Sequence, residues 1–262
     1  MNFKNYIREQ KSLIKAYKYG FTSGGIKIKT HKNNTNVLFL KNKNIYRKYS
    51  FTKEGIKKIE AEKKGLEWYC KKSKLNNKDI IKSYVKKKDF SFIDIKNIKG
   101  KKIMSWKSII YNYSYLRRVL KHYKKFSKKR INSQIHGDLT FDNIIFQKKS
   151  LFILDWEFFN SKKNFWGYDI VYLFLSAVCL PFMLKKKFSK KEEFIFKKLW
   201  KELIDLKIDK KILSDPFKFF ENHIKKNSVL KKGYNLSKAK FYPFMTNDIH
   251  KKRIIEIINS IK

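Results

Sequence analysis

The chain has 262 residues, of which 42% are hydrophobic and 16% aromatic. A chain of this size and content can bury a large core, and with nine glycines and three prolines its composition excludes disordered, collagen-like and miniprotein classes. The 64 lysines and arginines against 22 acidic residues give a formal net charge of +42. Such a balance is typical of proteins that bind nucleic acid or an anionic membrane surface.

The type of basic residue weakens that interpretation. Only six of the 64 basic residues are arginine, and the lysines are spread over the whole chain. Arginine is favoured for the bidentate recognition of phosphates and bases, so scattered lysines are more typical of compositional drift. A non-catalytic basic module that binds nucleic acid or another polyanion is therefore the alternative interpretation, and we expect no specific nucleic-acid partner.

The cysteines and the apolar segments indicate a cytoplasmic protein. Cys70 and Cys179 have no CxxC or Cys/His spacing, which is typical of reduced, buried thiols. The longest apolar stretch, 170–184, has 15 residues and contains Pro181, which is short for a membrane span. The first 17 residues contain no apolar run of signal-peptide length. We expect no transmembrane segment and at most weak association with anionic surfaces.

The hydrophobic pattern changes near residue 100. Before it, short apolar runs separated by turn residues predict an antiparallel sheet and one helix, with strands at 25–30, 37–40, 45–49, 80–85 and 90–95 and the helix at about 53–72. After it, the pattern predicts helices at about 105–126, 170–184, 190–207, 216–225 and 249–261, and a hairpin of strands at 143–146 and 151–154. The predicted class is α+β with two lobes, 1–97 and 98–262, and a ligand cleft between them.

Oxygen-bearing side chains bracket the predicted hairpin. Asp138 precedes the first strand, Asn143 follows five residues later, and Asp155 comes directly after the returning strand. A hairpin brings its two ends to one edge, so we expect these side chains to lie close together. A carboxylate that orients a hydroxyl, with a carboxylate and an amide that hold Mg²⁺, suits phosphoryl transfer.

Two segments carry a family resemblance. HGDLTFDN at 136–143 and ILDWE at 153–157 resemble the catalytic loop and the metal-binding segment of the aminoglycoside phosphotransferase and choline/ethanolamine kinase superfamily, relatives of the protein kinases. The resemblance implies a two-lobed protein-kinase-like fold with a nucleotide-binding N-terminal lobe and a catalytic and acceptor-binding C-terminal lobe. It implies ATP and Mg²⁺ as cofactors, Asp138 as catalytic base, His136 as the brace of the loop, and Asn143 and Asp155 as Mg²⁺ ligands.

A kinase-like fold also needs a strand lysine on the nucleotide phosphates and a helix glutamate that holds this lysine. The strand at 45–49 offers Arg47 and Lys48, which point to opposite faces. Lys48 is favoured because sugar-phosphotransferase-like members resemble this pair, and Arg47 stays open because choline kinase relatives can place an arginine there. Glu62 is favoured over Glu60 because it lies on the apolar stripe of its helix.

Other parts of the site stay open. The phosphate-covering loop is either 23–25 or 33–36. Glu157 either touches substrate or forms a structural ion pair, and Trp156 either contacts the acceptor or packs in a core. Asp169 is expected to cap the helix that follows it and to brace the loop.

The resulting hypothesis is an ATP- and Mg²⁺-dependent kinase that phosphorylates a hydroxyl of a small molecule, such as choline, ethanolamine or a sugar.

Overall fold

The computed structural model describes residues 11, 14–15, 17–20, 25–30, 35–103, 109–125, 133–184, 189–226 and 248–261. The chain divides into two compact units. The first comprises Met1–Lys99 and the short segment Asp155–Phe159, and the second comprises Gly100–Leu154 and Asn160–Lys262. The sequence pattern places a single boundary after residue 97. In the structure the chain also returns to the first unit later in the sequence, because Asp155–Phe159 belongs to that unit.

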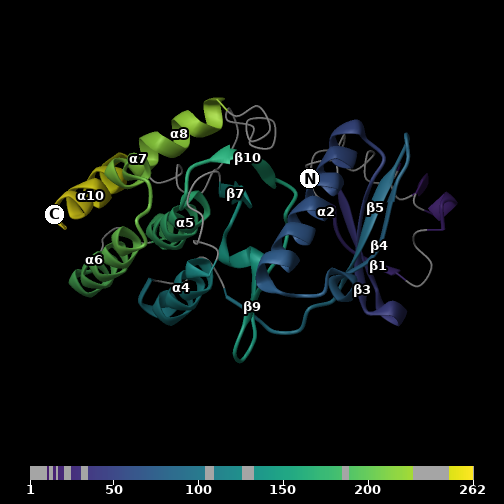
Figure 1. Ribbon diagram of the computed structural model, residues 1–262, viewed down its shortest axis with the longest axis horizontal. Coiled ribbons are helices and arrows are strands. Elements are labelled where there is room, and N and C mark those ends of the chain that lie inside the picture. The colour runs from purple at the N-terminus through teal and green to yellow at the C-terminus, as the bar shows by residue number, and fades with distance from the viewer. Residues whose placement is uncertain are drawn as a thin grey trace. The chain divides into compact units, whose positions relative to one another are not determined.

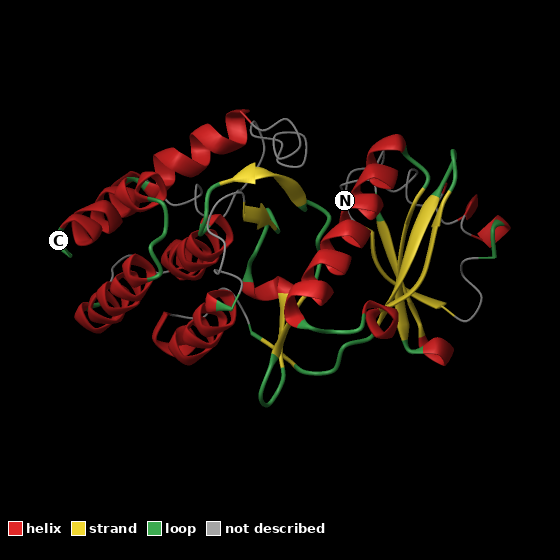
Figure 2. Ribbon diagram, in the orientation of Figure 1, coloured by secondary structure: helices red, strands yellow, loops and turns green. Residues whose placement is uncertain are grey.

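The first unit contains a five-stranded antiparallel sheet (Figures 1 and 2). Its spatial order is β1-β2-β3-β5-β4, with β1 at Gly25–Thr30, β2 at Asn36–Leu40, β3 at Ile45–Ser50, β4 at Ile81–Lys86 and β5 at Ser91–Lys96. Leu38, Leu40 and Tyr49 are among the buried residues of its core. Because side chains alternate along a strand, β3 in the middle of the sheet presents neighbouring residues to opposite faces.

The helix α2, Lys53–Ser73, packs against β3, β4 and β5. Thr52 caps its start by accepting a hydrogen bond from the backbone N–H of Gly55 at 3.1 Å. The helix ends at Lys74, which adopts the left-handed conformation with φ 57°. Ile59 and Leu66 on its apolar stripe are fully buried. Two short helices lie in connections of this unit: η1 at Lys41–Lys43 joins β2 to β3, and α3 at Asn77–Ile80 precedes β4.

The segment Asp155–Phe159 is held on α2 by aromatic packing. The ring of Trp156 lies 5.7 Å from that of Trp68 and 5.4 Å from that of Tyr69, measured between centroids. Gly65 makes this approach possible, since a Cβ at this position would lie 2.5 Å from the Cβ of Trp156. The glycine therefore lets the segment sit directly against the helix.

The second unit is mainly helical (Figure 1). Its helices are α4 at Ile109–Lys124, α5 at Tyr168–Leu184, α6 at Lys190–Asp205, α7 at Lys210–Ser214, α8 at Pro216–Lys226 and α10 at Asp248–Asn259. The described side chains of α5 are buried, as its apolar sequence predicts, and α4 packs against both α5 and α6. Ser189 and Glu192 form a capping box at the start of α6.

Short strands accompany these helices. The hairpin consists of β8 at Ile144–Phe146 and β9 at Leu151–Ile153, and β6 at Lys101–Lys102 pairs with β8. The 3-10 helix η2, Phe141–Asn143, enters the hairpin. A separate pair joins β7 at Ser133–Ile135 to β10 at Asn160–Asn164.

The predicted α+β class is confirmed, and most predicted elements are found within one to three residues of their expected bounds. The strands β6, β7 and β10 and the helices α3 and α7 were not predicted, because they are short and because β6 and β10 contain only polar residues. The predicted start of the helix at 105 and parts of both candidate phosphate loops lie outside the described residues. No helix in the described part of the chain is long and apolar enough to span a bilayer.

Candidate active site

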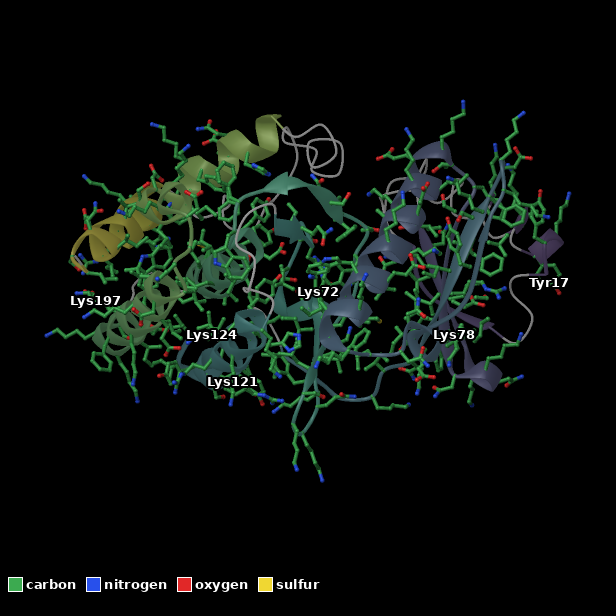
Figure 3. All side chains as sticks on the ribbon, in the orientation of Figure 1. Tyr17, Lys72, Lys78, Lys121, Lys124 and Lys197 are labelled. Carbon is green, nitrogen blue, oxygen red and sulfur yellow. The ribbon has the colours of Figure 1, made fainter. Side chains whose placement is uncertain are left out.

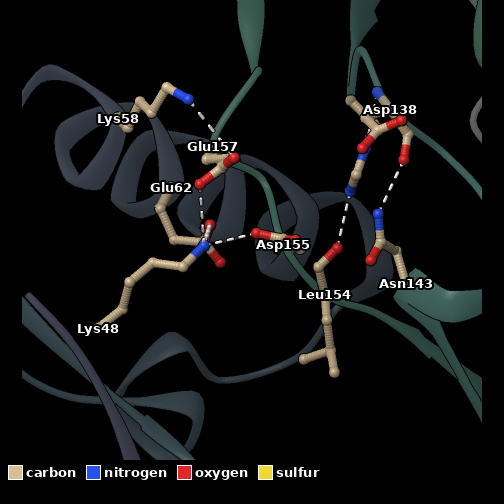
Figure 4. A network of polar contacts seen from close by, with 9 residues as sticks. Lys48, Lys58, Glu62, Asp138, Asn143, Leu154, Asp155 and Glu157 are labelled. Atoms are coloured by element: carbon tan, nitrogen blue, oxygen red, sulfur yellow. Dashed lines mark hydrogen bonds and ion pairs between the residues drawn. The ribbon is translucent and has the colours of Figure 1, made fainter. Parts of the chain in front are cut away.

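A buried lysine and three carboxylates form a polar cluster in the first unit (Figure 4). The Nζ atom of Lys48, on β3, lies 2.9 Å from Oε2 of Glu62, on α2. The same atom lies 2.5 Å from Oδ1 of Asp155 and 3.5 Å from Oε2 of Glu157. The strand, the helix and the Asp155–Phe159 segment thus each supply a charged side chain to the same cluster.

The three carboxylates keep Lys48 protonated. Desolvation on burial lowers the pKa of Lys48, but the charges of Asp155, Glu62 and Glu157 more than offset this effect and hold the pKa well above its usual value. Burial raises the pKa of Glu62 to about 7, against the opposing charge of Lys48. Lys48 is therefore a fixed positive charge at neutral pH.

The alternative residues Arg47 and Glu60 lie in other ion pairs. Arg47 faces the opposite side of the sheet, where Nε and Nη2 each donate to Asp94 at 2.7 Å. Glu60 lies near the surface and pairs with Lys86 at 2.7 Å and Lys64 at 3.0 Å. Strand alternation separates Arg47 from Glu62, so the structure pairs Lys48, rather than Arg47, with the helix carboxylate.

The residues of the segment after β9 differ in their exposure to solvent. Asp155 has a left-handed backbone with φ 63°, and its side chain is 32% exposed. Glu157 and Trp156 are buried, with Glu157 between Lys48 and Lys58 and Trp156 among the rings on α2. The structure thus gives Glu157 ion-pair partners and Trp156 packing partners, and their contact with a substrate stays a prediction.

In the second unit, Asp169 organises the loop that contains the HGD sequence. Its carboxylate accepts hydrogen bonds from the backbone N–H groups of His136 at 2.8 Å and Gly137 at 3.0 Å, and from the hydroxyl of Tyr123 at 2.9 Å. Burial raises the pKa of Asp169, and these donors oppose the rise. Asp169 is the second residue of α5. It therefore braces the loop from within the helix, rather than from the expected position before it.

His136 and Asn143 join this loop to the hairpin. The Nδ1 atom of His136 accepts from the N–H of Asp138 at 3.3 Å, which leaves Nε2 to donate to the carbonyl of Leu154 at 2.7 Å. The amide Nδ2 of Asn143 donates to the carbonyl of Asp138 at 2.8 Å. The loop is thereby tied to Leu154, which directly follows β9, and to Asn143, the last residue of η2.

Sequence reasoning did not assign contacts to two residues that touch these clusters. Tyr172, on α5, donates from its hydroxyl to Oδ1 of Asp138 at 3.2 Å, a contact for which the sequence carries no signal. Lys58 contacts Glu157 at 3.7 Å. A signal for Lys58 exists, since it lies one helical turn before Glu62 on the inward face of α2.

The donor chemistry fits Mg²⁺ bound together with phosphates. Asp155 and Asn143 offer carboxylate and amide oxygens, which are the hard ligands that Mg²⁺ prefers. Because Asn143 uses Nδ2 on the loop, its Oδ1 is the end that can face a cation. Within the described ranges, no group of three His, Cys, Asp or Glu residues could hold a metal ion. Mg²⁺ in nucleotide sites commonly uses one or two carboxylates and completes its shell with phosphate and water.

Comparison with solved structures finds similar chains. A protein assigned as a fructosamine-3-kinase from Haemophilus somnus 129PT has 12% identity and a TM-score of 0.43, with 96% of this chain and 97% of that chain covered. The choline kinase LicA from Streptococcus pneumoniae has 14% identity and a TM-score of 0.37, with 96% and 99% covered. APH(2")-IIa, in a ternary complex with streptomycin and ATP, has 13% identity and a TM-score of 0.35, with 93% and 99% covered. No protein-family model and no curated protein sequence matches the chain.

Proposed function

We propose that the protein is an ATP- and Mg²⁺-dependent phosphotransferase that transfers the γ-phosphoryl group to a hydroxyl of a small molecule. The observation that carries the proposal is the buried, protonated Lys48 held by Glu62 and Asp155. The same chain carries an HGD loop that Asp169 braces. A fixed ammonium and a rigid carboxylate loop are two groups that phosphoryl transfer requires.

Lys48 would bind the nucleotide phosphates. Its ammonium group has three N–H donors, and Glu62 fixes the side chain's direction through the 2.9 Å contact. Because the cluster keeps the pKa of Lys48 high, the positive charge is present at every physiological pH. A charge held in position before the substrate arrives stabilises a transition state more effectively than a mobile one.

Asp138 would orient the acceptor hydroxyl and accept its proton. Tyr172 holds Oδ1 of this carboxylate, and Asn143 holds the backbone carbonyl of the same residue. The loop around Asp138 is thus immobilised from two sides. When bound, Mg²⁺ and ATP supply the transferable phosphoryl group and neutralise its charge, and Asn143 and Asp155 would hold the cation.

Three aromatic rings pack together next to Asp138, and all three are buried. Tyr172 stacks on Tyr168 with centroids 6.4 Å apart, and Phe220 lies 4.8 Å from Tyr168 and 5.7 Å from Tyr172. These rings support Asp138 from behind. We propose choline or ethanolamine and a sugar as the two acceptor classes, on the resemblance carried by the segments 136–143 and 153–157.

The cysteines are consistent with a cytoplasmic location, which we also propose. Cys70 and Cys179 are both buried thiols. Burial raises the pKa of the Cys70 thiol to about 11, and the charge of Glu67 adds to this rise. Such unreactive thiols are common in a reducing compartment.

Phosphoryl transfer from γ-labelled ATP with Mg²⁺ tests the proposal on a panel of choline, ethanolamine, hexoses, aminosugars and a metabolite extract. Asp138→Asn should lower kcat about 1,000-fold and leave Mg²⁺·ATP binding intact. Asp142→Asn is the matched control, since this exposed residue of the same loop has no proposed role and its replacement removes the same charge.

A labelled product from the wild type and from Asp142→Asn, but not from Asp138→Asn, would identify the acceptor class. The proposal fails if no acceptor is labelled and if Mg²⁺·ATP at 100 times a micromolar Kd gives no thermal stabilisation, where about 2.7 kcal/mol is expected.

A further inference from the structure

Two lysines of this lysine-rich chain are unlike the others that the structure describes. Lys48 and Lys58 are 6% and 7% exposed, and every other lysine with a described environment is at least partly exposed. Lys72 and Lys124, for example, are exposed, and Lys197 is partly exposed (labelled in Figure 3). Both buried lysines contact the same residue, Glu157.

The contact between Lys58 and Glu157 is incomplete as a hydrogen-bonded pair. The Nζ atom of Lys58 lies 3.7 Å from Oε1 of Glu157 (Figure 4). The same atom lies 4.8 Å from the centroid of the Phe158 ring. In the part of the chain that the structure describes, neither this Nζ atom nor Oε2 of Glu157 has a hydrogen-bond partner, although both atoms are buried. Buried charged atoms without hydrogen bonds are costly. Each of these two atoms can therefore still form a stabilising hydrogen bond.

The carboxylates around Lys48 differ in their exposure to solvent. Three carboxylates, Glu62, Asp155 and Glu157, face the buried lysines, and the Asp155 side chain is 32% exposed against 2% and 5% for the two glutamates. Asp155 is thus the carboxylate that a cation from solvent can reach. A cation that binds Oδ1 of Asp155 replaces Lys48 at that atom, and Lys48 then loses one of its two short contacts.

We propose that Glu157 is the replacement partner of Lys48 when Asp155 turns to a divalent cation, and that Lys58 is the positioning residue that holds Glu157 ready. This inference rests on the proposed function, in which Asp155 binds Mg²⁺. Oε2 of Glu157 is already 3.5 Å from Nζ of Lys48, so a movement of about 0.6 Å gives a normal hydrogen bond. Lys58 attracts Oε1, the other oxygen of the same carboxylate, which keeps Oε2 on the side of Lys48.

This arrangement has a specific consequence for ligand binding. Without Lys58, Glu157 is not anchored, and recruitment of Asp155 by the cation leaves Lys48 with Glu62 as its remaining short contact. Binding of nucleotide with Mg²⁺ should therefore weaken, whereas binding of nucleotide without Mg²⁺, which leaves Asp155 on Lys48, should change little. A purely structural role for Lys58 would weaken both equally.

Calorimetric titration with a non-hydrolysable ATP analogue, with and without Mg²⁺, tests this difference. Lys58→Met should weaken Mg²⁺-dependent binding about tenfold and metal-free binding less than twofold. Lys58→Arg should restore most of the loss. The control Lys57→Met, at an exposed neighbouring position on α2, should match the wild type in both titrations.

Glu157→Gln provides a second approach that keeps the side chain's shape. It should reproduce the selective loss, and the double variant Lys58→Met/Glu157→Gln should lose no more than either single variant, because both act through one contact. Thermal unfolding of each ligand-free variant identifies any that fail to fold. If Lys58→Met does not fold, Glu157→Gln and Lys58→Arg decide the question.

The possible outcomes separate the inference from the proposed function. Equal weakening of both titrations, or unchanged binding in Lys58→Met and Glu157→Gln, overturns the role of Lys58 and leaves the kinase proposal standing. Failure of the wild type itself to bind the analogue with Mg²⁺ contradicts the kinase proposal.

Discussion

Lys48 is the residue on which the charges of the first unit converge. Its ammonium faces Glu62, Asp155 and Glu157 within 3.5 Å, and each of these buried or half-buried carboxylates depends on that charge. A residue in this position affects both stability and chemistry, because removal of one partner of a buried ion pair leaves the other charge uncompensated.

Replacement of Lys48 by methionine should abolish phosphoryl transfer and lower the free energy of unfolding by about 3 kcal/mol. Adding Glu62→Gln should recover part of the lost stability, since it removes a buried negative charge, but should not restore activity. Chemical denaturation measures both effects. Lys63→Met, which breaks the half-exposed pair with Glu67 at 2.6 Å, is the control and should cost less than about 1 kcal/mol. A double variant less stable than Lys48→Met would contradict the charge argument.

His122, on α4, makes the stability of the second unit depend on pH. Burial lowers the pKa of His122 to about 4, and Lys125 adds to this effect, whereas the unfolded chain has a value near about 6.5. The unfolded state therefore binds a proton first as the pH falls. The stability from this residue is complete above pH about 6.5 and is lost progressively down to pH about 4.

His122→Gln should consequently flatten the dependence of the unfolding free energy on pH between about 6.5 and 4, by an amount on the order of 2 kcal/mol. Urea denaturation of both proteins at several pH values in this window gives the difference directly. His250→Gln, on α10, is the comparison variant, because its side chain is partly exposed. Parallel curves for His122→Gln and the wild type would show that another group causes the slope.

Among the elements, α2 and the Asp155–Phe159 segment form the contact that positions the first cluster. Gly65 lies where the helix meets Trp156, and Lys58 and Glu62 lie on the same inward face. One helix thus supplies both the surface that carries the segment and two of the charges that meet it.

Gly65→Ala should destabilise the protein by about 1–3 kcal/mol, although alanine is the better helix former by about 1 kcal/mol. The reason is steric, because the new Cβ would lie 2.5 Å from the Cβ of Trp156 and 3.0 Å from that of Phe159. Thermal unfolding measures the change. In a Trp156→Ala background the same substitution should cost clearly less, and an equal cost in both backgrounds would show that Trp156 is not the obstacle.

At the scale of the whole molecule, the net charge of +42 opposes compaction. Apart from Lys48 and Lys58, the described lysines are at least partly exposed, so salt screens their mutual repulsion. The buried cluster around Lys48 is screened much less. Salt should therefore relieve repulsion at the surface without weakening the cluster.

Raising monovalent salt from 20 to 300 mM should increase Tm by about 5 °C, since relief of repulsion favours the compact state. Thermal unfolding in both NaCl and KCl distinguishes screening from binding of a particular cation. A Tm that falls with salt would show that attractive surface pairs outweigh the repulsion.

Local patterns predicted a large part of this fold. The alternation in β2, β3 and β5 and the apolar stripe of α2 predicted these elements, because each needs only the residues within it. The same stripe predicted that Glu62, rather than Glu60, faces inward, and Glu62 is buried. His136 and Asn143 also lie in one short segment, so the hydrogen bonds within that segment depend on residues that are close in the sequence.

Contacts between distant parts of the chain could not be predicted in this way. Lys48 and Asp155 are 107 positions apart, and no periodicity indicates that 155–159 joins the first unit. The helical spacing places Lys58 on the same face of α2 as Glu62, but its ion pair with Glu157 depends on a carboxylate that reaches it from a distant part of the chain. The amino-acid order by itself therefore determined the longer helices, the strands of the five-stranded sheet and the hairpin, and the set of reactive side chains, because these depend on near neighbours. The ion pairs among those side chains depend on long-range packing and became visible only in the folded chain.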